Sequence, residues 1–138
     1  MSRIVLITLI APTLSSCIAM VPVNLAQNNG SVEFHIEEEG LIFKTNRDVT
    51  YAVVYEPQGK NWREWKTMWR ISAKVFEHDK STYNLPKPGA IKYGLLPEGY
   101  VEAVKALPLE KGIEYEIHIS GPGYGGGIKF VYSGNDSS

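Results

Sequence analysis

Residues 109–119 read LEKGIEYEIHI, and this stretch decides the fold. Leu109 lies six residues before Tyr115, with a glycine turn at Gly112 between them. This spacing is typical of a tyrosine corner, in which the tyrosine hydroxyl bonds to backbone a few residues upstream and pins a crossover between β-sheets. Beyond the corner, apolar and charged residues alternate. We therefore expect a half-buried strand with Tyr115 and the two following isoleucines facing inward.

Short segments of the same kind lie on both sides of this corner, separated by turn residues. Strands are predicted over residues 32–36, 41–45, 49–56, 68–72, 91–95, 100–106, 115–119 and 128–132. The segment 49–56, VTYAVVYE, is apolar on parts of both faces, which favours a central strand. The sequence therefore predicts an all-β fold, an antiparallel immunoglobulin/fibronectin-like β-sandwich of about seven to eight strands.

The first residues have the features of a lipoprotein signal peptide. Arg3 provides a positive start, and the uncharged apolar run over 4–14 is shorter than the span of about 20 residues that crosses a membrane. The sequence LSSC at 14–17 looks like the lipobox of bacterial lipoproteins, whose cysteine carries diacylglycerol. The alternative is a simple secretory signal with Cys17 nearby by chance. That alternative leaves an unpaired thiol in an oxidising compartment.

The lipobox interpretation predicts how the 138 residues are divided. We expect a signal peptide over 1–16, a lipidated tether over 17–30 that begins at Cys17, a sandwich domain over 31–134 and a polar tail over 135–138. Ile18 rather than Asp follows the cysteine. By resemblance to Gram-negative lipoproteins, this predicts a lipid anchor on the periplasmic face of the outer membrane.

The charge balance argues against a nucleic-acid partner. Without residues 1–16, the chain has 13 Lys and Arg against 15 Asp and Glu, and it contains no basic block. Proteins that bind nucleic acid usually carry a clustered basic patch that neutralises phosphates. We therefore expect no nucleic-acid partner.

The glycine-rich stretch ISGPGYGGG at 119–127 contains the spacing G-x-G-x-x-G, which dinucleotide-binding loops share. A dinucleotide site needs a helix directly after the glycines, because the pyrophosphate binds at the helix N-terminus. Here the strand-forming sequence IKFVY follows instead. We expect no nucleotide, and interpret the glycines as a hairpin loop between the last two strands, with Tyr124 at its centre.

The sequence gives little support for catalysis or a metal site. His35 and His118 occupy outward positions of predicted strands and could share a metal only if those strands were neighbours. No G-x-S-x-G elbow occurs, and no pair of carboxylates stands out for glycoside chemistry. We predict a protein that is not an enzyme and that has no cofactor and no metal.

The three tryptophans at 62, 65 and 69 fit one face of a short helix, but their segment also fits a strand. We expect a loop or a single helical turn that leads into the strand over 68–72. A tryptophan stripe belongs to the core more often than to a binding surface. Aromatic residues outside clean strand alternation are nevertheless candidates for contact with a partner, because Trp and Tyr are common interface hot spots. These candidates are Trp62, Trp65 and Tyr124.

The C-terminal part is similar to a family of small periplasmic lipoproteins classed as type VI secretion immunity proteins. The matching positions are Tyr93-Gly94, Pro97-Glu98-Gly99-Tyr100, Ala106-Leu107-Pro108-Leu109, Gly112, Tyr115 and Phe130. Together with the lipobox, the resemblance covers the signal and about the last third of the chain. It implies a lipid-anchored periplasmic protein that binds and neutralises a secreted antibacterial effector.

Two other functions stay open from the sequence. The chain could be a structural or accessory lipoprotein of the envelope, as part of a secretion apparatus or of outer-membrane assembly. It could also bind a small ligand or glycan, with Trp62 and Trp65 as stacking surfaces. All three functions are binding functions.

Overall fold

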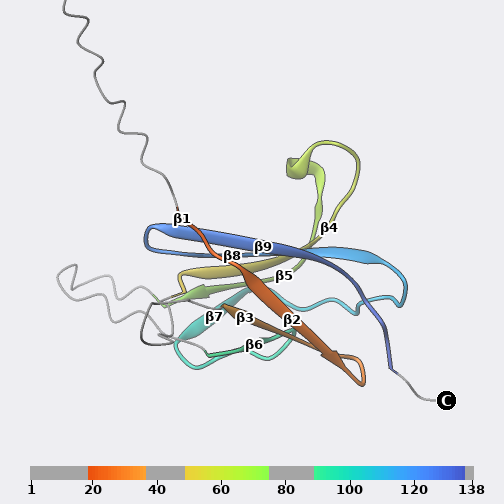
Figure 1. The fold of residues 1–138 in the computed structure, drawn as a ribbon, viewed down its shortest axis with the longest axis horizontal. Helices are drawn as coiled ribbons and strands as arrows, with labels where there is room; N and C mark the ends of the chain where they lie inside the picture. Colours follow the sequence, from red (N-terminus) through yellow and green to blue (C-terminus); the bar gives the residue numbers. More distant parts are fainter. Residues whose placement is uncertain (1–18, 37–48, 75–88, 136–138) are drawn as a thin grey trace, which may run out of the picture.

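The computed structural model describes residues 19–36, 49–74 and 89–135. These residues form nine β-strands and one single-turn 3-10 helix, arranged as two sheets that face each other (Figure 1). The predicted all-β antiparallel sandwich is confirmed. The predicted signal peptide, the lipidation site Cys17, the predicted strand over 41–45 and most of the polar tail lie outside the described residues. Among the described residues, no helix is long and apolar enough to cross a bilayer.

One sheet has six strands and the other has three. The larger sheet contains, in spatial order, β1 (Ala19–Met20), β9 (Tyr124–Val131), β8 (Glu114–Gly121), β4 (Tyr51–Glu56), β5 (Lys66–Ala73) and β7 (Tyr100–Val104). The smaller sheet contains β2 (Val23–Asn28), β3 (Ser31–Ile36) and β6 (Ile91–Lys92). Neighbouring strands are antiparallel apart from β1 and β9, which run parallel. The expected central position of 49–56 is confirmed, since β4 lies between β8 and β5.

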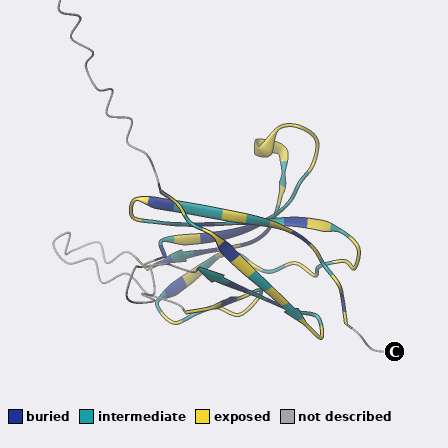
Figure 2. Ribbon diagram, viewed as in Figure 1, coloured by how far each residue is buried: buried dark blue, intermediate teal, exposed yellow. Residues whose placement is uncertain are grey.

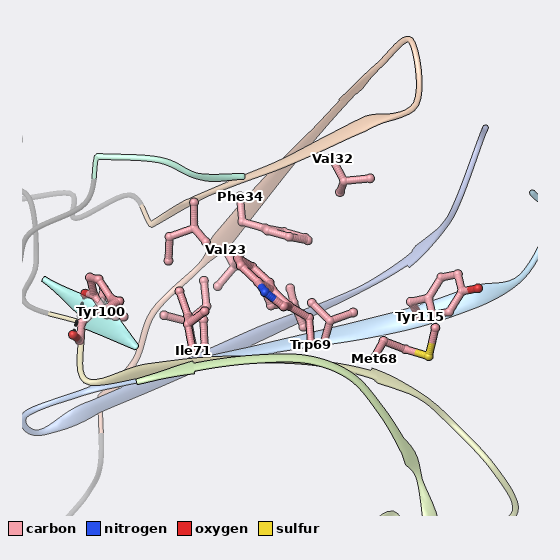
Figure 3. Close-up of a cluster of buried hydrophobic side chains, with 14 of the residues drawn as sticks. Val23, Val32, Phe34, Met68, Trp69, Ile71, Tyr100 and Tyr115 are labelled. Atoms are coloured by element: carbon pink, nitrogen blue, oxygen red, sulfur yellow. Dashed lines mark hydrogen bonds between the residues drawn. The ribbon is translucent and has the colours of Figure 1, made fainter. Parts of the chain in front are cut away.

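The core fills the space between the two sheets, as the buried stripes on the strands show in Figure 2. Val32 and Phe34 point from the smaller sheet toward Trp69 and Ile71 on the larger one (Figure 3). Tyr115 and the following two isoleucines, Ile117 and Ile119, are buried as predicted. Period-two alternation therefore places the apolar faces correctly.

Trp69, on β5, is completely buried between the two sheets. A register shift between Val54 and Tyr55 on β4 lets Met68 and Trp69, two consecutive residues, both be buried. The Trp69 indole N–H donates to Glu102 Oε2 at 2.9 Å, so the buried donor is satisfied. A β-bulge of this kind re-aims side chains that strict alternation would send to opposite faces.

Tyrosine hydroxyls fasten the connections around this core. Tyr93 donates to the Leu107 carbonyl at 2.7 Å, Tyr100 donates to the Val49 carbonyl at 2.7 Å, and Tyr132 donates to the Gly30 carbonyl at 2.9 Å. Each bond joins segments that are distant in the chain. A buried hydroxyl that pairs with backbone satisfies two polar groups at once.

The tyrosine corner is present. The Glu110 N–H donates to the Tyr115 hydroxyl at 2.9 Å, and Leu109 packs against the core. The segment it fixes does not cross between sheets, however. It leads from the edge strand β7 back to β8 within the larger sheet, and passes β5 through a bond from the Leu107 N–H to the Met68 carbonyl. The immunoglobulin/fibronectin type stays a prediction, because sheets of six and three strands differ from the four and three of the constant immunoglobulin domain.

The expected tether over 17–30 is wrong from Ala19 onward. Residues 19–28 form β1 and β2, so the sandwich begins before the predicted boundary at residue 31. Gly126 on β9 permits this crossing, because a Cβ there would collide with the Val21 carbonyl oxygen. Only β1 pairs with β9, about a hundred positions away, and local patterns do not reveal that pairing. β2 pairs with the adjacent β3 across Asn29-Gly30, a local hairpin signal that the tether assignment overlooked.

Replacement of this glycine should therefore weaken the attachment of the N-terminal strands. We expect Gly126→Ala to lower the free energy of unfolding by about 1–3 kcal/mol, because backbone must shift to admit the methyl group. Amide hydrogen exchange should accelerate at Val21, whose N–H bonds to the Gly125 carbonyl. Unchanged stability and unchanged exchange at Val21 would contradict this account of the glycine.

Stability should also fall at high pH. Burial raises the pKa of Tyr93 and of Tyr115 above the ordinary value. A raised folded-state pKa means that the stabilisation is complete below the unfolded-state pKa, near 10, and is lost as the pH rises above it. Denaturant titrations at about pH 8 and about pH 11 should show this loss. The double variant Tyr93→Phe/Tyr115→Phe should lose less stability between the two pH values, whereas Tyr51→Phe, at an exposed tyrosine, should behave like the wild type. Equal losses in all three proteins would contradict the attribution of the stability loss to Tyr93 and Tyr115.

Candidate functional site

The hairpin between β4 and β5 projects beyond the rest of the sandwich (Figure 1). Its end is the most exposed described part of the larger sheet, with residues 58–64 all exposed (Figure 2). Gly59, with φ of 64°, allows the chain to turn. The Asn61 side chain then accepts from the Arg63 N–H at 3.1 Å and caps the helical turn η1 (Trp62–Glu64). The predicted single turn that leads into a strand is confirmed.

Trp62 lies in this turn with 61% of its surface exposed. The Arg63 guanidinium stacks over the indole ring at 5.6 Å from its centroid. An exposed tryptophan places a large apolar surface in water, which is unfavourable unless the surface has another use. The pair combines the two residue types that most often dominate protein interfaces, Trp and Arg.

Behind the turn, three rings pack edge to face on the outer face of the larger sheet. Tyr55 contacts Trp65 at 6.1 Å and His118 at 5.6 Å between ring centroids, and Trp65 lies 6.5 Å from His118. Tyr55 comes from β4, His118 comes from β8, and Trp65 immediately precedes β5. Edge-to-face contacts of this kind hold aromatic rings in a defined arrangement. The cluster therefore forms a firm base beneath the exposed turn.

These rings border a shallow groove of about 460 Å³. Its walls are Tyr51, Tyr55, Trp62, Trp65 and His118. Of the three partner-binding candidates, Trp62 and Trp65 thus lie side by side along one groove. Trp69 does not join them, because it belongs to the core. The prediction that the tryptophan stripe is core holds for Trp69 only.

A second, neighbouring trough of about 580 Å³ shares Tyr51 and His118 with the first groove. Its floor is the glycine run Gly125–Gly127, which adds backbone but no side chains to this part of the surface. In the β8–β9 ladder, Gly125 pairs with Ser120 and Gly127 pairs with His118. The two grooves therefore run along one face of the sheet.

The glycine-rich stretch forms the predicted hairpin between the last two strands, but the loop is shorter than predicted. The connection consists only of Pro122 and Gly123, whose φ is 74°, and Gly125–Gly127 lie inside β9. Tyr124 opens that strand and is 3% exposed. It therefore belongs to the protein interior, and its prediction as a partner-contacting residue is wrong. The two-residue turn places Tyr124 in β9 on the same face as Phe130, because the two residues are separated by three periods of two, and both are buried.

The polar groups near the aromatic cluster are only partly satisfied. Glu116 Oε1 lies 2.7 Å from His118 Nε2, and this contact orients the imidazole. Glu116 Oε2 and the Trp65 indole nitrogen are buried and have no hydrogen-bond partner among the described residues. Such groups are usually paired, so each one costs folding free energy. This part of the surface is not arranged for maximum stability.

The two histidines considered for a metal site lie apart. His35 is on β3 in the smaller sheet, whereas His118 is on β8 in the larger one. Each contacts the glutamate two residues before it, and His35 Nε2 lies 3.0 Å from Glu33 Oε1. Within the described residues, no three His, Cys, Asp or Glu side chains gather as metal ligands. His78 lies outside the described residues.

Three members of the candidate site were not among the predicted partner-binding residues: Tyr51, Tyr55 and His118. Tyr51 and Tyr55 are four residues apart on one strand, so period two places both on the same face. What could not be read from the sequence is that β8 pairs with β4 and brings His118 opposite Val53. This pairing is non-local, and no local pattern specifies it.

Comparisons of the chain with protein-family models, with curated proteins and with solved structures find no match. The resemblance to immunity lipoproteins therefore stays a prediction. The site itself offers exposed rings, cations and a His–Glu pair, which suit binding.

Substitutions of two tryptophans should distinguish a residue of the candidate site from a residue of the core by their effects on the free energy of unfolding. Trp65→Phe removes an unpaired donor together with some packing, so we expect the free energy of unfolding to change by less than about 1 kcal/mol. Trp69→Phe leaves Glu102 without its donor and opens space in the core, which should cost about 2–4 kcal/mol. Urea denaturation of both variants tests this contrast. Equal losses would show that Trp65 is as much a core residue as Trp69.

Proposed function

We propose that this protein acts by binding another protein through the end of the β4–β5 hairpin and the adjoining aromatic groove. The observation that carries the proposal is the exposed indole of Trp62 at the end of a projecting hairpin, supported from behind by three packed rings. Interfaces gain most of their binding energy from a few such aromatic and arginine residues.

The arrangement limits the entropy that binding must overcome. The hairpin is anchored by the antiparallel ladder between β4 and β5, and β4 is held on its other side by β8. Asn61 and the η1 turn fix the backbone around Trp62. A contact residue that is already positioned loses less freedom on binding than one on a mobile loop.

The more specific proposal is a periplasmic lipid-anchored immunity protein that binds and neutralises a secreted antibacterial effector. It is supported by the lipobox at Cys17, by the resemblance of the C-terminal part, and by a surface suited to a protein partner. A lipid on Cys17, at the periplasmic face of the outer membrane, would make the membrane a second partner. The proposed role involves no reaction catalysed by this chain, no nucleotide and no nucleic acid.

Strand register supports this role through the position of the hairpin. Ala19, two residues after Cys17, pairs with Tyr124 beside the β8–β9 turn. The first residue of β4, Tyr51, pairs with Ser120 near that turn, and β4 then runs away from the turn. The loop that joins β4 to β5 therefore lies at the opposite end of the same sheet. A lipid on Cys17 would therefore hold one end of the sheet at the membrane and present Trp62 at the other end.

A protection assay tests the proposal. Deletion of the gene should make cells sensitive to contact-dependent killing by sister cells, and the full chain should restore protection. Trp62→Ala should fail to protect although it accumulates normally, because loss of an interface tryptophan weakens affinity by about 30-fold or more. Leu95→Ala is the matched control, since Leu95 is 62% exposed and lies outside the hairpin; it should protect like the wild type.

Other outcomes would favour the other functions. A deletion strain that survives contact with its sister cells would contradict the immunity role. Crosslinking that recovers a component of a large envelope assembly would then support the structural or accessory lipoprotein. Quenching of tryptophan fluorescence by a glycan, lost in Trp62→Ala, would instead support a glycan site in the aromatic groove.

A further inference from the structure

Charge is distributed unevenly between the projecting hairpin and the rest of the chain. Residues 49–74 contain five Lys and Arg against two Glu, whereas the remainder contains nine Lys and Arg against 13 Asp and Glu. The hairpin is thus basic within an acidic protein. The overall charge of −1 hides this separation.

All five basic side chains of the hairpin are exposed: Lys60, Arg63, Lys66, Arg70 and Lys74. Within the described part of the chain, none of them forms an ion pair with a carboxylate. Their charge is therefore directed to solvent instead of being neutralised by neighbours. Lys60, Arg63 and Lys66 lie at the projecting end, whereas Arg70 lies within β5 and Lys74 follows the opposite end of that strand. Unpaired cations produce a local positive potential that reaches roughly 8–10 Å into physiological salt.

Two of these cations are held against the aromatic surface. Arg63 stacks over Trp62 at 5.6 Å, and Arg70 lies 6.0 Å from the centroid of Tyr51. Cation–π contact orients a guanidinium while its N–H groups stay available for carboxylates. Tyr51 and Trp62 also line the aromatic groove. Positive charge and aromatic surface therefore belong to the same site.

We propose that the partner is a protein that presents an acidic surface to this hairpin, with carboxylates that meet Lys60 and Arg63 around the indole of Trp62. This inference rests on the proposed function and specifies the partner's chemistry. Complementary charge accelerates encounter and fixes orientation, while the apolar ring slows dissociation. The acidic remainder of the chain would repel the same partner, which restricts docking to the hairpin.

Photo-crosslinking with the full chain in cells tests the inference. Gln58→p-benzoylphenylalanine places the probe at the exposed hairpin end and leaves Trp62 intact. Lys60→Glu/Arg63→Glu in this background should reduce the crosslinked product about tenfold or more. Lys92→Glu/Lys105→Glu changes the total charge equally at exposed sites outside the hairpin, and it should leave the product unchanged. The product should also decrease when lysates are crosslinked at rising salt, a measurement that needs no variant.

Each alternative outcome decides a different point. A product from position 58 that is insensitive to both reversals and to salt would overturn the acidic partner and leave the proposed function standing. Products from a probe at Leu95 but none from position 58 would overturn the assignment of the hairpin. Absence of any crosslinked protein from either position would contradict the proposed function itself.

Discussion

The burial of Trp69, with its indole N–H bonded to Glu102, is the constraint on which the rest of the structure depends. A side chain of this size can be enclosed only if both sheets and the β7 edge surround it. Tyr93 packs edge to face against the indole at 5.3 Å and fastens the 105–113 connection through Leu107. The tyrosine hydroxyls then hold the remaining connections in place. The described domain is stabilised by packing and by these tyrosine hydroxyl bonds to the backbone.

Much of the fold could be predicted because its determinants are local. Alternation predicted the buried face of β8, apolar residues on both faces predicted the central position of β4, and the tryptophan spacing predicted the turn before β5. The spacing from Leu109 to Tyr115 predicted the corner. The errors occurred where pairing is non-local or composition is misleading. Residues 19–28 were assigned to a tether although the Asn29-Gly30 turn indicates a hairpin of β2 with β3, and only the pairing of β1 with β9 is non-local. The glycines of β9 were assigned to a loop because glycine is rare in strand interiors, although close approach of another backbone can require it there.

Only part of the candidate site could be predicted from the sequence, because non-local strand pairing assembles the rest. Trp62 and Trp65 stand out as aromatic residues without clean alternation, and the structure places them on one groove. Tyr124 stood out equally and is buried, because the turn before it is shorter than its glycines suggested. His118 and Tyr55 complete the ring cluster only through the pairing of β8 with β4. A core tolerates few unpaired polar groups, so the unsatisfied Trp65 and Glu116 mark the region where packing alone does not explain the choice of residues.

The pairing of β1 with β9 joins the first described strand to the last one. The edge of the larger sheet therefore cannot close until nearly the whole chain is available. Contacts this distant in sequence slow folding, because the chain must lose the entropy of closing a long loop before the paired strands contribute any stabilising free energy. For the exported lipoprotein that we propose, such a delay would be an advantage. The proposed precursor would stay extended during passage through a narrow channel, and its final strand would complete the sheet only after it emerged.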